Sequence, residues 1–121
     1  MIKVCLADNH PVVHYGVKSY FKDHDDISIV AMQSLLFGKP ELQLFGSKVS
    51  RTALFEHLVK LYKVASILGA TKLVFGSPKN RFVPEDLGQN KAWDLAVEFF
   101  NKAGEAANDF GVELCLEPNP T

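Results

Sequence analysis

Short apolar runs alternate with amphipathic stretches along this chain. The apolar runs lie at residues 2–7, 27–32, 72–75 and 112–116, and turn-forming residues bound each of them. Such runs indicate strands that are buried on both faces. Between them, apolar side chains recur at helical spacing, in a β-α-β-α-β-α-β order. Strands that alternate with helices predict a parallel sheet with right-handed crossovers.

The expected helices have recognisable ends. Pro11 suits the first turn of a helix whose apolar positions run from Val12 to Phe21. Ser47 or Ser50 can cap the next helix. Gly69 and Gly111 provide left-handed stops after the second and third helices.

A polar segment follows the third expected strand. The apolar run ends at Gly76, and a long connection of residues 76–89 begins. Ligands of parallel sheets and barrels bind beyond the carboxyl ends of the strands, and long loops there are often functional. We therefore predict a weak anion site, for phosphate or sulfate, formed by Ser77, Lys79, Asn80 and Arg81. The alternative is a solvated loop with ordinary surface charges.

Composition limits the class of protein. The chain has 121 residues, of which 47% are hydrophobic and 22% charged, and a net charge of −1. This length predicts one domain, 1–121. The charge argues against nucleic-acid binding, and the absence of a long apolar run argues against membrane insertion. A cytoplasmic protein is expected, with Cys5 and Cys115 as buried, reduced thiols.

Residues 1–31 resemble the start of a response-regulator receiver domain, a flavodoxin-like fold. The similarity begins with Ile2-Lys3-Val4-Cys5-Leu6-Ala7-Asp8-Asn9-His10-Pro11 and continues to Ala31. The family holds magnesium with two adjacent acids after its first strand. Asp8 matches one of them, and Asn9 replaces the other. The family's phosphate-accepting aspartate has no counterpart after the third strand, so the resemblance implies a receiver without signalling chemistry.

Residues 32–121 resemble the middle of a sugar phosphate isomerase/epimerase of the xylose-isomerase-like TIM-barrel type. The motifs are Met32-Gln33-Ser34-Leu35-Leu36-Phe37-Gly38, Leu73-Val74-Phe75-Gly76-Ser77-Pro78-Lys79-Asn80-Arg81 and Cys115-Leu116-Glu117-Pro118-Asn119-Pro120. The resemblance implies that Glu117 corresponds to the first carboxylate ligand of a divalent metal. The family's other ligands come from later strands, so the resemblance implies an incomplete catalytic site.

The two truncated resemblances, which meet between Ala31 and Met32, indicate an engineered fold chimera. Neither the catalytic nor the signalling site would be intact, so the chain is not expected to be an enzyme. A flavodoxin-like three-layer sandwich is expected, with a four-stranded parallel sheet of order 2-1-3-4. Half of a TIM barrel is the alternative fold. The alternative functions are an isomerase/epimerase fragment with weak metal or phosphate binding, and a degenerate receiver that acts through protein contacts.

No cofactor is expected. The alternative is weak binding of Mg²⁺ or Mn²⁺ by Asp8 or Glu117, although a single carboxylate is a poor site for either ion. His10 and His14 have chelating spacing, but a partly solvated surface pair is the more common arrangement. His57 is expected to be exposed, and Trp93 to contribute to packing.

A homodimer is expected, because the fourth strand is an open edge and one face of the sheet lacks a cover.

Overall fold

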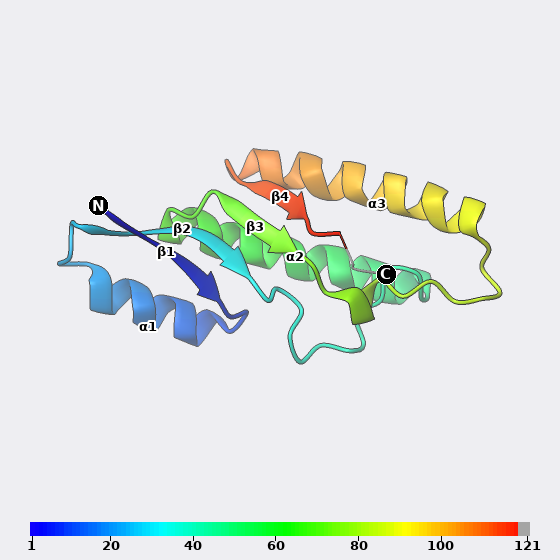
Figure 1. The fold of residues 1–121 in the computed structure, drawn as a ribbon, viewed down its shortest axis with the longest axis horizontal. Helices are drawn as coiled ribbons and strands as arrows, with labels where there is room; N and C mark the ends of the chain where they lie inside the picture. The colour runs from blue at the N-terminus through cyan, green and yellow to red at the C-terminus, as the bar shows by residue number, and fades with distance from the viewer. Residues whose placement is uncertain (119–121) are drawn as a thin grey trace.

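The computed structural model describes residues 1–118, so Asn119 and Pro120 of the last motif lie outside the described residues. Four strands and three long helices alternate, and a short 3-10 helix, η1, follows the third strand (Figure 1). The elements are β1 (Ile2–Ala7), α1 (Pro11–Phe21), β2 (Ile27–Gln33), α2 (Lys48–Leu68), β3 (Lys72–Phe75), η1 (Pro78–Asn80), α3 (Gln89–Asp109) and β4 (Glu113–Leu116). The predicted alternation of strands and helices is therefore confirmed.

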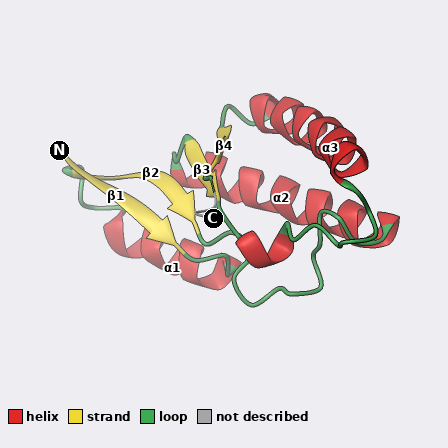
Figure 2. Ribbon diagram, turned by 45° about the vertical axis from the view of Figure 1, so that its right-hand side comes forward, coloured by secondary structure: helices red, strands yellow, loops and turns green. Residues whose placement is uncertain are grey.

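The strands form one parallel sheet in the order β1-β2-β3-β4. The expected order 2-1-3-4 is wrong, and so is the three-layer sandwich. Each strand is added beside the previous one, so every crossover advances in the same direction, as in a barrel. The helices then occupy one layer, in which α1 packs on α2 and α2 packs on α3 (Figures 1 and 2). The half-barrel alternative describes this arrangement.

The register assigns the two faces of the sheet. One row of paired residues packs into the core beneath the helices: Leu6, Met32, Leu73 and Leu114. The preceding row points to the opposite face, because side chains alternate along a strand: Cys5, Ala31, Lys72 and Glu113. No helix among the described residues covers this second face, which we call the open face.

Helix α2 forms the centre of the helical layer. Its buried side chains are Leu54, Leu58, Leu61, Tyr62, Val64 and Ala65. The hydroxyl of Ser47 accepts a hydrogen bond from the Ser50 backbone at 3.1 Å, and Gly69 ends the helix with a φ of 82°. Tyr62 donates to the Ala103 carbonyl on α3 at 3.0 Å, and burial raises the pKa of Tyr62 to about 12.

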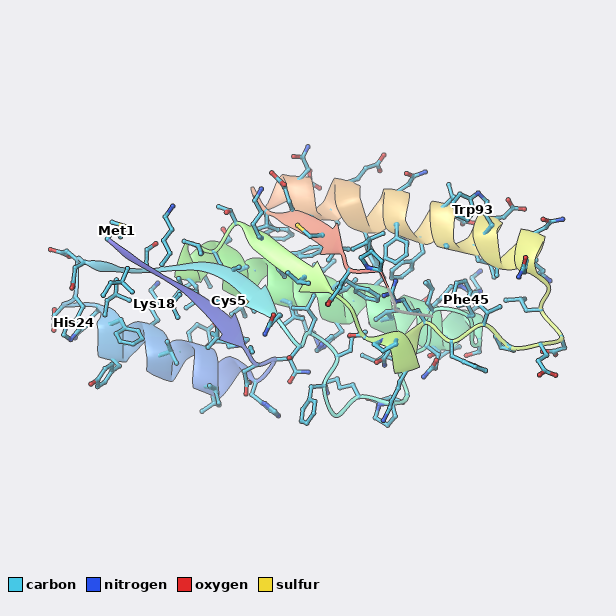
Figure 3. All side chains as sticks on the ribbon, viewed as in Figure 1. Met1, Cys5, Lys18, His24, Phe45 and Trp93 are labelled. Atoms are coloured by element: carbon cyan, nitrogen blue, oxygen red, sulfur yellow. The ribbon has the colours of Figure 1, made fainter. Side chains whose placement is uncertain are left out.

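Helices α1 and α3 are less covered than α2, because each has a neighbouring helix on one side only. Val12 and Tyr20 on α1 are 83% and 73% exposed, and Trp93 on α3 is 71% exposed, so the prediction that Trp93 contributes to packing is wrong (Figure 3). Cys5 is exposed and Cys115 half-buried, because both belong to the open face rather than to the core. Within residues 1–118, no helix has the length and apolar character needed to cross a membrane.

Candidate functional site

Two adjoining cavities lie at the carboxyl ends of β2, β3 and β4, and they share Ser34 and Ser77. The first has a volume of about 470 Å³ and is lined by Ser34, Leu36, Phe37, Gly38, Lys39, Pro40, Ser77, Pro78, Lys79 and Asn80. The second, of about 320 Å³, is lined by Gln33, Ser34, Val74, Gly76, Ser77 and Glu117. We refer to the two together as the edge cavity. It lies where parallel α/β folds commonly bind ligands.

Ser34 and Ser77 have a left-handed backbone. Their φ angles are 58° and 40°, and among the described residues no other residue except glycine has a positive φ. This conformation costs a residue with a side chain about 1–2 kcal/mol, so it persists only where surrounding contacts impose it. Such outliers cluster at ligand sites. Ser34 directly follows β2, Ser77 follows β3 after Gly76, and both line the edge cavity.

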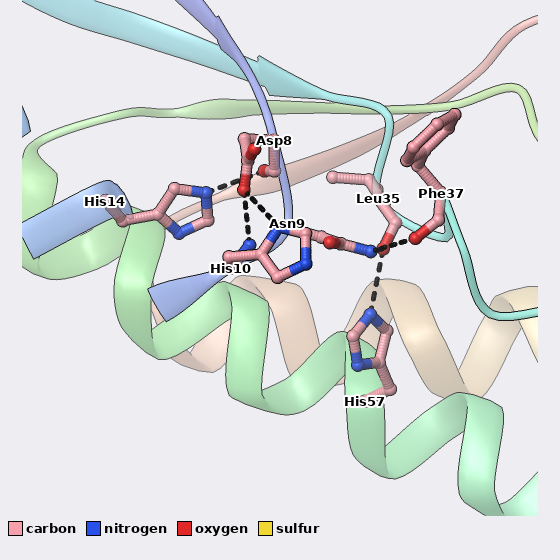
Figure 4. A network of polar contacts seen from close by, with 7 residues as sticks. All are labelled: Asp8, Asn9, His10, His14, Leu35, Phe37 and His57. Carbon is pink, nitrogen blue, oxygen red and sulfur yellow. Dashed lines mark hydrogen bonds and ion pairs between the residues drawn. The ribbon is translucent and has the colours of Figure 1, made fainter. Parts of the chain in front are cut away.

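The loop after β2 is fixed by two side chains from other elements. Asn9 donates from Nδ2 to the carbonyl oxygens of Leu35 and Phe37, each at 3.0 Å (Figure 4). His57 on α2 donates from Nε2 to the same Leu35 oxygen at 2.8 Å. His57 is therefore half-buried rather than exposed as predicted, and this burial lowers its pKa. These bonds hold Ser34 and Phe37 against the cavity.

Asn80 fixes the other wall. Its buried Nδ2 donates to the carbonyl oxygens of Lys39 and Leu42, at 2.8 and 2.7 Å. The Leu44 backbone N–H donates in turn to the Asn80 carbonyl at 2.9 Å. Asn80 thus joins η1 to the segment before α2, and its amide donors point into the protein. Asn80 therefore lies in the predicted anion site, and its side chain holds the loop in position there.

The predicted cations have different surroundings. Lys79 is exposed at the edge cavity, where Lys39 also lines the wall. Arg81 donates from its guanidinium to the backbone oxygen of Glu117. Sequence reasoning missed Lys39, although the turn residues on either side of it, Gly38 and Pro40, mark a loop beyond a strand end. The structure therefore brings Lys79 together with Lys39 at this cavity.

Glu117 extends over the end of β3. A Cβ atom added at Gly76 would lie 2.7 Å from Oε2 of Glu117, closer than such atoms approach in folded proteins. Glycine at position 76 therefore makes room for the carboxylate. The exposed Glu117 side chain reaches the same cavity as Gln33 and Ser77. The second part of the cavity thus contains the carboxylate of Glu117 and the amide of Gln33, the first part contains the ammonium groups of two lysines, and the two serines line both parts.

Asp8 lies at the end of β1, in a separate cluster. Its carboxylate accepts a backbone hydrogen bond from His10 at 2.6 Å and contacts Nδ1 of the same residue at 2.9 Å (Figure 4). The backbone bond is the largest cause of the lowered pKa of Asp8. His14 is fully buried and donates from Nε2 to the Asp8 carbonyl oxygen at 2.6 Å, so the expected surface pair of histidines is not formed.

The donor set does not fit the divalent metal that the resemblance implies. Within residues 1–118, no three side chains of His, Cys, Asp or Glu lie close enough together to hold an ion. A single carboxylate cannot fix the coordination geometry. We therefore assign no metal-dependent step to these residues.

Comparisons with known proteins show what the fold is similar to. No protein-family profile and no curated protein sequence matches the chain. Among solved structures, a D-tagatose 3-epimerase-like protein superposes with a TM-score of 0.74 at 17% identity, over 98% of this chain and 44% of that one. A xylose isomerase domain protein from Planctomyces limnophilus gives a TM-score of 0.65 at 13% identity, over 98% of this chain and 45% of its own.

A third structure is similar along nearly the whole chain. It is a sugar phosphate isomerase/epimerase from Parabacteroides distasonis, with a TM-score of 0.62 at 13% identity, over 99% of this chain and 47% of its own. The chain thus spans less than half the length of these structures. At such identities the likeness establishes the fold, a four-stranded portion of a βα barrel, and it includes the receiver-like residues 1–31.

Proposed function

We propose that the edge cavity binds a sugar phosphate weakly and that the described residues do not turn it over. The observation that carries the proposal is the pair of left-handed residues, Ser34 and Ser77, which line both parts of this cavity. Backbone strain at two adjacent strand ends is difficult to explain by packing alone, because glycine would remove it. The names of two similar structures, an epimerase-like protein and a sugar phosphate isomerase/epimerase, supply the class of ligand.

The groups in the cavity suit the two parts of such a ligand. Lys39 and Lys79 are point charges for a phosphate group. Glu117 and Gln33 offer acceptors and a donor for sugar hydroxyl groups. Phe37, which is 77% exposed, presents an apolar surface beside them. The opposite ends of the cavity would therefore recognise opposite ends of the ligand.

Catalysis requires more than these groups supply. Moving a proton between adjacent carbons needs a base and an acid placed around the substrate. Glu117 is the carboxylate among the side chains that line the two parts of the cavity. We therefore propose binding without isomerisation or epimerisation by this segment alone.

The chimeric origin remains a hypothesis about the history of the chain. The proposed junction, Ala31–Met32, lies inside β2, where Ala31 pairs with Cys5 and Met32 with Leu6, directly after a shift in the register between β1 and β2. Joining two βα folds within a shared strand would preserve this pairing. The hypothesis does not change the proposed ligand, because β2, β3 and β4 supply the edge cavity.

The test is a titration of the isotopically labelled chain with fructose 6-phosphate, followed by NMR. We expect saturable shifts at residues 33–39 and 76–80, with a dissociation constant of about 1 mM, equivalent to about −4 kcal/mol. Inorganic phosphate should shift the residues around Lys79, and fructose those around Glu117.

Matched variants separate specific binding from general attraction. Lys39→Ala with Lys79→Ala should weaken fructose 6-phosphate binding at least about tenfold, because both phosphate-binding charges are lost. Lys63→Ala, which removes an exposed charge from α2, should leave the binding unchanged. The proposal fails if shifts do not saturate, or if the double variant binds as tightly as the parent chain.

A further inference from the structure

We propose that two copies of this chain close a single ring of eight parallel strands, in which β4 of each copy pairs with β1 of the other. The inference concerns assembly and does not depend on ligand binding. It differs from a sandwich of two open faces, because the contact is made by the edges of strands. In such a ring, residues of both copies would lie together at the end of the barrel where the strands terminate.

The first observation is that the two outer strands have complementary free edges. β1 pairs only with β2, and β4 only with β3, within residues 1–118. In β4, the N–H groups of Glu113 and Glu117 donate toward β3, to Thr71 and Phe75. The intervening N–H groups of Leu114 and Leu116 therefore point to the free edge. All strands are parallel, so β1 of a second copy can continue the sheet in the same direction.

The second observation is the distribution of exposed apolar side chains. The helices next to the free edges expose Val12, Val13, Tyr15 and Tyr20 on α1, and Trp93 and Val97 on α3. Helix α2, which has a helix on each side, instead buries six residues. In a closed ring, α3 of one copy and α1 of the other would lie on the two sides of the seam between β4 and β1. The three helices of each copy leave the outer face of that seam open, and these exposed apolar side chains would line the gap.

The third observation is the length of the similar barrels. This chain covers 44–47% of the three solved structures, so two copies would span about nine-tenths of such a barrel. Four strands are half of the eight that close a βα barrel. Two copies of the described residues would therefore supply the number of strands in a closed ring.

The shear of a βα barrel predicts the register of the new seam. An eight-stranded barrel has a shear of eight residues, so half a turn displaces a row of side chains by about four. This displacement is already visible within one copy, in the row of side chains formed by Ala7, Gln33, Val74 and Cys115. Ala7 and Gln33 are the last residues of their strands, whereas Val74 and Cys115 lie one residue before the ends of theirs. The continuation of this row on the second copy is the partner subunit's Lys3.

This register places opposite charges side by side. The partner subunit's Lys3 would lie next to Cys115, diagonally between Glu113 and Glu117 on the same face. Lys3 and both glutamates are exposed in the single chain. Glu113 already pairs with Lys72 at 2.6 Å on the open face of the single chain. In the same register Glu117 would lie beside the partner subunit's Cys5.

The first test is the mass of the chain in solution. Light scattering after size exclusion should give twice 13.4 kDa at a concentration of about 100 μM. Leu116→Pro removes an edge N–H without touching a bond to β3, and should weaken dimerisation at least about tenfold. Leu116→Val retains the N–H and an apolar side chain, so it should dimerise like the parent chain.

The second test identifies the neighbouring strand. In one chain β1 and β4 are separated by β2 and β3, roughly 14 Å apart, which is too far for a disulfide. In the ring the partner subunit's position 3 lies about 5 Å from Cys115. Lys3→Cys combined with Cys5→Ser should therefore give a covalent dimer upon oxidation, linked between positions 3 and 115.

The matched control moves the new thiol one strand inward. Ser28 pairs with Lys3 in the register, so Ser28→Cys combined with Cys5→Ser places a thiol on β2, away from the seam. This variant should not couple to Cys115. The ring is wrong if the chain is monomeric at 100 μM, if Leu116→Pro dimerises like Leu116→Val, or if the thiol at position 28 couples as readily as the thiol at position 3.

Discussion

The side-chain amide of Asn80 lies 2.7 Å from the carbonyl oxygen of Leu42, and this bond joins two loops that are far apart in the sequence. The same amide nitrogen reaches the Lys39 carbonyl. We expect Asn80→Ala to lower the free energy of unfolding by about 1–3 kcal/mol, because two carbonyl groups lose their donor in a buried setting. Urea denaturation followed by circular dichroism measures the change.

Asn101→Ala is the control for this substitution. Asn101 is exposed on α3, and its replacement should change the free energy of unfolding by no more than about 0.5 kcal/mol. Equal effects of the two substitutions would show that the Asn80 bonds do not secure the loops.

Ser77→Gly should separate stability from binding. The φ of 40° at Ser77 is strained for a residue with a side chain, so glycine should raise the free energy of unfolding by about 0.5–1 kcal/mol. Fructose 6-phosphate binding should weaken, because the hydroxyl group is lost and the loop is freer. Ser77→Ala retains the strain and removes the hydroxyl. A gain in stability from alanine as large as that from glycine would contradict the role of strain.

Gly76→Ala tests the position of the Glu117 carboxylate. The new methyl group would lie 2.7 Å from Oε2, and the exposed end of a flexible side chain can move away. We therefore expect little change in the free energy of unfolding but weaker binding of fructose, measured by NMR titration. Gly104→Ala is the control, since a Cβ there meets nothing within 4 Å. It should stabilise α3 by about 0.5–1 kcal/mol and leave binding intact.

His57 makes stability depend on pH. Burial is the main cause of its lowered pKa, and Lys39 and Lys60 act in the same direction, against the bond to Leu35 and the charge of Glu41. The unfolded chain therefore binds a proton more readily than the folded chain. Stability should be fully present above the ordinary histidine pKa of 6.5 and should fall as the pH drops below it.

Urea denaturation at pH 7.5 and 5.5 measures this effect. His57→Gln keeps an N–H donor near Leu35 and cannot titrate, so the loss of stability on acidification should be smaller. His24→Gln replaces an exposed histidine in a turn and should retain the full dependence. An unchanged dependence in His57→Gln would assign the effect to other groups.

Some of the candidate site was accessible from the sequence. The apolar run that stops at Gly76 correctly located a strand end, and Ser77 and Lys79 do line a cavity there. The role of Asn80 was not accessible, because its partners Lys39 and Leu42 are about forty residues away. Which way a polar side chain points depends on contacts that no local pattern records.

The sequence by itself determined the elements, because strand and helix periodicity, caps and glycine stops act over a few residues. Ser47 and Gly69 bound α2 as predicted, and the run at Lys72–Phe75 is β3. The order of the strands was decided only by the tertiary structure. A βα unit has the same local pattern whether the next strand is added beside the last one or on the other side of β1, so periodicity cannot separate a flavodoxin-like sheet from half a barrel. That choice left Cys5 and Cys115 on an open face instead of in a core.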